Sequence, residues 1–157
     1  MRLIYYCYGS AHSSITAAAI HLGRLPATHT PSVDEVLNLT DFDLAHNDSL
    51  GNLFYKGKDE LGIEVYTIGM GAEREIVRNS LISLIKEANY NPEDFYFVEA
   101  LAHINRLARI GGALSRRYGL VTWGRKMAAH GICQSYEQLA NLVSKTKEEM
   151  RKRLEKS

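Results

Sequence analysis

The segment from residue 3 to residue 23 constrains the fold of this chain more than any other part of the sequence. It opens with the apolar run Leu3–Tyr8, which has the composition of a buried β-strand. From Ser13 onward, apolar residues recur at helical spacing until Gly23, a residue type that commonly ends helices. A strand, a short polar loop and a helix in immediate succession predict the first unit of an α/β fold, with its first strand at the centre of the sheet.

The loop between this strand and helix is the leading candidate for a ligand site. It directs several backbone N–H groups and a helix N-terminus at one point, where an anion is favoured. Gly9 allows a tight turn, the serines supply hydroxyl groups, and His12 can change charge near neutral pH. We therefore expect the loop to bind a phosphorylated small molecule, in the first place a nucleotide. The predicted ligand contacts in the loop are Gly9, Ser10, Ala11, His12, Ser13 and Ser14.

The rest of the chain alternates between patterns typical of strands and of helices. Residues 53–56 and 63–68 predict a β-hairpin around a turn-rich connection, and residues 95–98 predict a further buried strand. Helices are expected after Gly71, over residues 101–118 and after Ser135, and residues 126–129 could form a last strand. This alternation predicts a three-layer α/β sandwich with a mixed, mostly parallel sheet and a P-loop-like or Rossmann-like first unit. We expect a single domain over residues 1–157, with residues 143–157 as a frayed helix end.

Two further loops are expected to share an edge of the sheet with the first loop. These loops, residues 69–71 and 99–102, each follow a predicted strand. In sheets of this kind, ligands bind outside the carboxyl ends of the strands. We therefore add Gly69 and Gly71 to the predicted ligand contacts.

A stripe of arginines lies on the helix predicted over residues 101–118. Arg106, Arg109 and Arg116 share one face at helical spacing. Such a stripe is usually a solvated face, but it could also border the anion loop or form a contact in a homo-oligomer. We predict Arg109 and Arg116 as ligand contacts, because an anion site without a lysine needs another source of charge.

Two segments each admit two interpretations. Gly111-Gly112 in mid-helix costs stability, which indicates either close packing against a strand layer or partner helix, or a local break between two helices. The segment from Thr40 to Asn52 has no hydrophobic periodicity, which predicts an exposed loop, either a lid or a solvated connector.

Several standard catalytic motifs do not fit the first loop. A P-loop would need glycine and lysine where the chain has Ser14 and Ile15. A cysteine phosphatase loop after Cys7 would need arginine at the position of Ser13, and Cys7 is better explained as a small buried residue. The histidines and cysteines match no zinc spacing, and His103 and Cys133 would meet only through the fold. We therefore predict no metal site, and the sequence identifies no cofactor.

His12 is the candidate catalytic residue, as a general acid or base beside Ser10 or Ser13. Its carboxylate partner is not fixed by the sequence. Asp41, Asp43 and Glu99 are the candidates. The alternative is that His12 only shapes the loop through hydrogen bonds.

Motifs along nearly the whole chain also resemble a known family. These are Cys7–Ser14, Ala18–Gly23, Leu25-Pro26, Gly57–Glu60, Gly111–Arg117, Gly119–Val121 and Gly124-Arg125. Together they resemble domain of unknown function 3189, found in Firmicutes. The resemblance implies a bacterial, cytoplasmic protein and implies no activity.

Composition narrows the function without identifying it. The net charge of +1 gives no general case for nucleic acid or a membrane surface. Two cysteines form no disulfide framework and are typical of a reducing cytoplasm. The enzymatic form of the expected function is a phosphotransferase or phosphohydrolase. The alternatives are a non-enzymatic protein that senses or sequesters a nucleotide, and an interaction protein without a small-molecule substrate.

Overall fold

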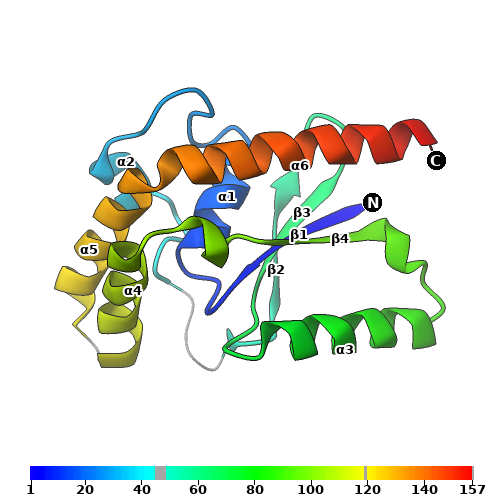
Figure 1. Ribbon diagram of the computed structural model, residues 1–157, viewed down its shortest axis with the longest axis horizontal. Helices are drawn as coiled ribbons and strands as arrows, with labels where there is room; N and C mark the ends of the chain where they lie inside the picture. The colour runs from blue at the N-terminus through cyan, green and yellow to red at the C-terminus, as the bar shows by residue number, and fades with distance from the viewer. Residues whose placement is uncertain (45–48, 119, 157) are drawn as a thin grey trace.

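The predicted first strand lies in the interior of a four-stranded mixed sheet (Figure 1). The computed structural model describes residues 1–44, 49–118 and 120–156. The strands are β1 (Arg2–Cys7), β2 (Leu53–Lys58), β3 (Glu64–Gly69) and β4 (Phe95–Glu99), in the spatial order β2-β3-β1-β4. β1 is parallel to both of its neighbours, β3 and β4, whereas β2 is antiparallel to β3. The predicted β-hairpin and the interior position of the first strand are confirmed.

Helices lie on both faces of the sheet. They are α1 (Ser13–His21), α2 (Val33–Leu37), α3 (Arg74–Glu87), α4 (Arg106–Tyr118), α5 (Val121–Gln134) and α6 (Tyr136–Lys156), with short 3-10 turns η2 (Pro92–Asp94) and η3 (Leu101–His103). Figure 1 shows α1 and α6 on one side of the sheet and α3 on the other. β1 contributes side chains to the cores on both faces of the sheet, because successive side chains of a strand point to opposite faces. Leu3 and Tyr5 join the larger core under α1 and α6, and Ile4 joins a smaller cluster with Ile68 and Met70.

α4 and α5 form a tightly packed helix pair, and glycines make the contact possible. A Cβ atom at Gly111 would lie 2.4 Å from the Ala128 nitrogen, and one at Gly131 would lie 2.2 Å from the Ala108 nitrogen. The close-packing interpretation is therefore confirmed at Gly111, with α5 of the same chain as the neighbour. The strand expected at residues 126–129 is wrong, because these residues belong to α5. The small side chains of Ala128 and Ala129 are buried in this helix.

The C-terminal helix is longer and better packed than the sequence suggested. α6 continues to Lys156, and Val143 and Met150 are buried in the main core, so the expected fraying from residue 143 is wrong. The Lys- and Glu-rich composition belongs to the solvent side of α6, where Lys152 pairs with Glu148. In the described part of the chain, no helix combines the length and apolar character needed to cross a membrane.

The segment between α2 and β2 contributes to the core. A capping box opens α2, with the Ser32 hydroxyl and the Glu35 carboxylate bonded to each other's backbone N–H groups. Beyond it, Phe42 is fully buried and Asp43 is nearly so, which corrects the expectation of an exposed loop at these two residues. Phe42 packs in the main core, and the Asp43 N–H donates to the Ala11 carbonyl at 2.9 Å. Residues 45–48 of the predicted loop lie outside the described residues.

Candidate functional site

The loop Gly9–Ser14 connects β1 to α1 and is largely enclosed. Ser10, Ala11, Ser13 and Ser14 are buried, and His12 is 9% exposed. The turn is made by Ser10, whose φ of 52° is unusual for a residue with a side chain. Gly9 keeps a negative φ, and a Cβ atom there would meet nothing within 4 Å. Gly9 is therefore not required for the turn, contrary to the sequence interpretation, and instead leaves open space beside the loop.

Two of the three loop serines are held by neighbouring side chains. The Ser10 hydroxyl donates to Thr67 Oγ1 at 2.9 Å. Cys7 Sγ accepts the Ser10 N–H at 3.2 Å and lies 3.1 Å from Ser14 Oγ. Cys7 is thus a buried partner within the loop, in agreement with its interpretation as a structural residue.

At the N-terminus of α1, polar groups lack protein partners among the residues that the structure describes. No side chain caps this helix end, and Ser13–Ile15 in its first turn are buried. The first N–H groups of an α-helix have no intrahelical acceptors and need a side chain, water or ligand. Within the described chain, the buried Ser13 hydroxyl oxygen also has no hydrogen-bond partner. A helix end of this kind can accommodate an anion, which accepts hydrogen bonds and interacts favourably with the helix dipole.

His12 is oriented by residues from two distant segments. Its Nε2 atom lies 2.9 Å from Asp43 Oδ1, and the Ser115 hydroxyl donates to Asp43 Oδ2 at 2.5 Å. Space for the imidazole comes from Gly112, where a Cβ atom would lie 2.9 Å from His12 Nδ1. Phe42 contacts the ring edge-on, with the two centroids 5.0 Å apart. Of the carboxylates that the sequence offered as partners, Asp43 is the one that meets His12.

The other two candidate carboxylates are bound elsewhere. Asp41 pairs with Lys56 at 2.9 Å, and Glu99 pairs with Arg74 at 3.0 Å. These ion pairs direct both groups away from the role suggested for them beside His12.

The loop after β3 meets the first loop, as expected for neighbouring parallel strands. A Cβ atom at Gly69 would lie 2.8 Å from the Gly9 carbonyl carbon, so this approach requires glycine at position 69. The Gly71 N–H donates to the Tyr8 carbonyl at 2.9 Å. Gly69 and Gly71 thus help to position the start of the first loop, through the contacts with Gly9 and Tyr8.

Of the two predicted arginines, the structure describes the side chain of Arg109. Arg109 is exposed on α4 and donates from Nη2 to the Leu101 carbonyl at 2.9 Å. The side chain of Arg116 lies outside the described residues.

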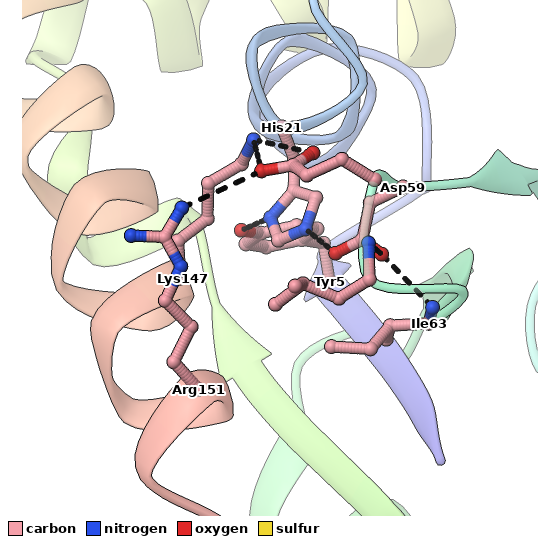
Figure 2. Close-up of polar contacts among 8 residues, drawn as sticks. Tyr5, His21, Asp59, Ile63, Lys147 and Arg151 are labelled. Carbon is pink, nitrogen blue, oxygen red and sulfur yellow. Dashed lines mark hydrogen bonds and ion pairs between the residues drawn. The ribbon is translucent and has the colours of Figure 1, made fainter. Parts of the chain in front are cut away.

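A second histidine, His21, forms a fully buried polar network at the other end of α1 (Figure 2). The Tyr5 hydroxyl lies 3.0 Å from His21 Nδ1, and His21 Nε2 lies 3.0 Å from Asp59 Oδ2. The second Asp59 oxygen accepts the N–H groups of Leu61 and Ile63, both at 2.9 Å. Burial raises the pKa of the Tyr5 hydroxyl and lowers the pKa of His21, although the Asp59 hydrogen bond partly opposes the latter. Tyr5 therefore donates to a neutral His21, and His21 donates to Asp59.

This network ties the β2–β3 turn to β1 and α1. Both ring nitrogens of His21 are occupied, and its side chain has no exposed surface. On the outer side, Lys147 of α6 pairs with Glu60 at 3.0 Å (Figure 2). The satisfied hydrogen bonds and the lack of solvent access identify a stabilising cluster, in contrast to the arrangement around His12.

Comparison with known proteins gives one match. A family model described as protein of unknown function (DUF3189) matches residues 2–148. The chain belongs to the DUF3189 family. No curated protein and no solved structure matches the chain. The family resemblance in the sequence is therefore confirmed, and the DUF3189 match spans both histidine clusters.

The described residues of this DUF3189 protein contain no group of three or more His, Cys, Asp or Glu side chains placed to hold a metal ion. What the site at the first loop offers is a helix end, serine hydroxyls and an imidazole held by a carboxylate. These groups can bind an anion and transfer a proton.

Three contributors to the DUF3189 site could not be assigned from the sequence alone. Asp43 was one of three candidate partners of His12 with nothing to favour it over the other two, and Ser115 was not singled out. Gly112 was recognised as a place of close approach, but His12 as its neighbour could not be inferred. His21 also had a signal, a polar residue between Ile20 and Leu22 in an apolar helix.

Proposed function

We propose that the loop Gly9–Ser14 binds the phosphate of a phosphorylated small molecule, with a nucleotide as the first candidate. The observation that carries the proposal is the buried, uncapped start of α1 together with the unpartnered hydroxyl of Ser13. Phosphate oxygens would accept hydrogen bonds from both. In this role the β1–loop–α1 unit acts as a P-loop-like or Rossmann-like cradle that lacks the lysine.

Backbone strain beside His12 supports a functional role for this region. Ser10 and Asp43 both have positive φ, at 52° and 63°, and both are buried. Such conformations cost roughly 1–3 kcal/mol each and cluster at ligand and active sites. Both strained residues adjoin His12. Ser10 precedes it by two positions in the loop, and Asp43 contacts its imidazole.

The Asp43–His12 pair supports an enzymatic form of the proposal. A carboxylate that accepts from Nε2 fixes the imidazole orientation and leaves Nδ1 to accept a proton. His12 would then act as general acid or base in a phosphohydrolase or phosphotransferase reaction. The two free cysteines are consistent with action in a reducing cytoplasm. A non-enzymatic nucleotide sensor would use the same cradle without turnover.

A thermal-shift and calorimetry screen tests binding. The panel contains inorganic phosphate, adenosine, AMP, ATP and GTP, and the proposal requires stabilisation by phosphorylated compounds and none by adenosine. Chromatography of each nucleotide after incubation separates an enzyme from a sensor. If no phosphorylated compound in the panel binds, the loop is only scaffold.

Three loop variants locate the bound phosphate. Ser13→Ala should weaken binding by about tenfold or less, because one neutral hydrogen bond is lost. Ser14→Ala is the matched control, since its hydroxyl already contacts Cys7. Gly9→Val should weaken binding most, because it fills the open space beside the loop while the turn at Ser10 remains. Equal affinity in wild type, Ser13→Ala and Gly9→Val would remove the loop from the binding site.

A further inference from the structure

A second concave site lies on the flank of α1, separate from the loop that opens this helix. It is a pocket of about 200 Å³ between α1, the segment after α2 and β2. Ile15, Ala18 and Ala19 of α1 form an apolar floor together with Leu39. Asn38, Thr40, Asp41, Arg24 and Lys56 complete the lining. Because none of the lining residues belongs to Gly9–Ser14, this pocket is distinct from the proposed phosphate site.

Lys56 lines this pocket from an irregular part of β2. The register between β2 and β3 shifts between Tyr55 and Gly57, so Lys56 is the extra residue of a β-bulge. Bulges change the direction of a side chain and are frequent beside functional sites. Gly57, with a φ of 147°, allows the backbone to continue after the bulge. Lys56 lies on the same face of β2 as Phe54, with its ammonium 5.4 Å from the centre of the Phe54 ring, and it lines the pocket from this face.

The cationic groups of the pocket are held in place but retain donors for a ligand. The Lys56 side chain is only 10% exposed, and its ammonium lies 2.9 Å from Asp41 Oδ2. Arg24 donates from Nη2 to the Lys56 carbonyl. An ammonium and a guanidinium each carry more N–H donors than these single bonds use. With Arg24 and Lys56 opposed by Asp41, the lining carries one net positive charge.

Size and charge together define the ligand class. A volume of about 200 Å³ equals roughly six or seven water molecules of liquid, which is below the range of drug-sized ligand sites. We propose that this pocket binds a small monocarboxylate with a short branched aliphatic body. The carboxylate contacts Lys56 and Arg24, and the aliphatic part lies on Ala18 and Ala19. A single negative charge matches the net charge of the lining, and the alanine floor accepts an apolar body without a polar partner.

The test uses isobutyrate as probe and isobutyramide as its neutral isostere, with binding followed by calorimetry and by backbone amide NMR shifts. Isobutyrate should bind and shift the amides of Ala18, Ala19 and Lys56, and isobutyramide should bind at least about tenfold more weakly. Inorganic phosphate is the comparison for the loop, and it should shift Ser13 and Ser14 while leaving the pocket amides in place. Absence of isobutyrate shifts at the pocket, or equal binding of acid and amide, would overturn the proposal whatever phosphate does.

Two variants test separately how the cationic group and the apolar floor of the pocket contribute to isobutyrate binding. Lys56→Met keeps the aliphatic stem and should weaken isobutyrate at least about tenfold. Ala18→Leu should abolish binding by filling the floor. Lys58→Met is the matched control, since Lys58 is on the same strand, is 58% exposed and pairs with Glu64 outside the pocket. Circular dichroism checks that each variant folds. Isobutyrate affinity unchanged in folded Lys56→Met contradicts the proposal even if Ala18→Leu fails to fold.

Discussion

The two ends of α1 each hold a histidine bonded to an aspartate, and the two pairs differ in what surrounds them. At the C-terminal end, His21 uses both ring nitrogens, and its aspartate accepts two further backbone N–H groups. At the N-terminal end, His12 is 9% exposed and lies beside an uncapped helix start and the unpartnered Ser13 hydroxyl. The same pair of residue types therefore lies in a closed hydrogen-bond network at one end of α1, and beside an uncapped helix start at the other, where we propose the ligand site.

Removal of each imidazole should give the largest difference between the two ends. His21→Ala removes the imidazole partner of the buried Tyr5 hydroxyl and of Asp59 Oδ2 and creates a cavity, so we expect a loss of about 3–5 kcal/mol. His12→Ala should cost about 1–2 kcal/mol, because water can reach this position and Ser115 still donates to Asp43. Urea unfolding of both variants measures the difference. Equal losses would mean that His12 is as structural as His21.

Neighbouring glycines on α4 should separate backbone packing from support of His12. Gly111→Ala places a methyl group against the α5 backbone and should destabilise by about 1–3 kcal/mol. Gly112→Ala meets only the His12 ring, which can move, and gains up to about 1 kcal/mol of helix propensity. We therefore expect near-neutral stability and a displaced His12 in Gly112→Ala, measured by unfolding and by the NMR shifts of the imidazole. A large loss of stability in Gly112→Ala, with the His12 shifts unchanged, would contradict this.

The buried end of α1 should also make stability depend on pH. Because burial lowers the pKa of His21 in the folded protein, the unfolded chain binds a proton first as pH falls through about 6.5. The contribution of His21 to the free energy of unfolding is therefore complete above that pH. Below it, the contribution decreases by at most about 1.4 kcal/mol per pH unit for one proton. Urea midpoints between pH 5 and 8 should fall less steeply toward acid in His21→Gln than in wild type. Parallel profiles would exclude His21 as the source.

The smallest expected effect has opposite signs at two adjacent serines. Ser13→Ala removes a buried hydroxyl without a protein partner and should leave stability unchanged or raise it by up to about 1 kcal/mol. Ser14→Ala loses the contact with Cys7 and should lower stability by about 0.5–1.5 kcal/mol. Thermal unfolding of the ligand-free protein distinguishes them. A clear destabilisation by Ser13→Ala would show that its hydroxyl has a structural partner.

Local sequence patterns were sufficient for the elements near the centre of the fold. The apolar run at Leu3, the helix from Ser13, the capping box at Ser32 and the hairpin of β2 and β3 all depend on neighbouring residues. The helix α5 was missed because its inward face consists of small residues such as Gly124 and Ala128. Such a face has little hydrophobic contrast, and its partner α4 is needed to explain it.

Only the part of the site that is contiguous in the sequence was predictable. His12 belongs to the loop Gly9–Ser14, so the sequence identified the loop and the histidine together. Asp43 reaches His12 from 31 positions away, and Ser115 reaches Asp43 from 72 positions away. No spacing rule connects residues over such distances, because their contact depends on how α4 and the segment before β2 pack on α1. The Gly111-Gly112 pair signalled a close approach but gave no information about which ring would fill it.

The burial of Met150 of α6 in the same core as Leu3 and Tyr5 of β1 has a consequence for biosynthesis. β1 leaves the ribosome before α6, the helix that covers its larger core. Until α6 emerges, the apolar face of the nascent sheet has no complete cover, although β3 and β4 are already available for pairing. The nascent chain therefore exposes apolar surface during synthesis, and its native core closes only after α6 has emerged.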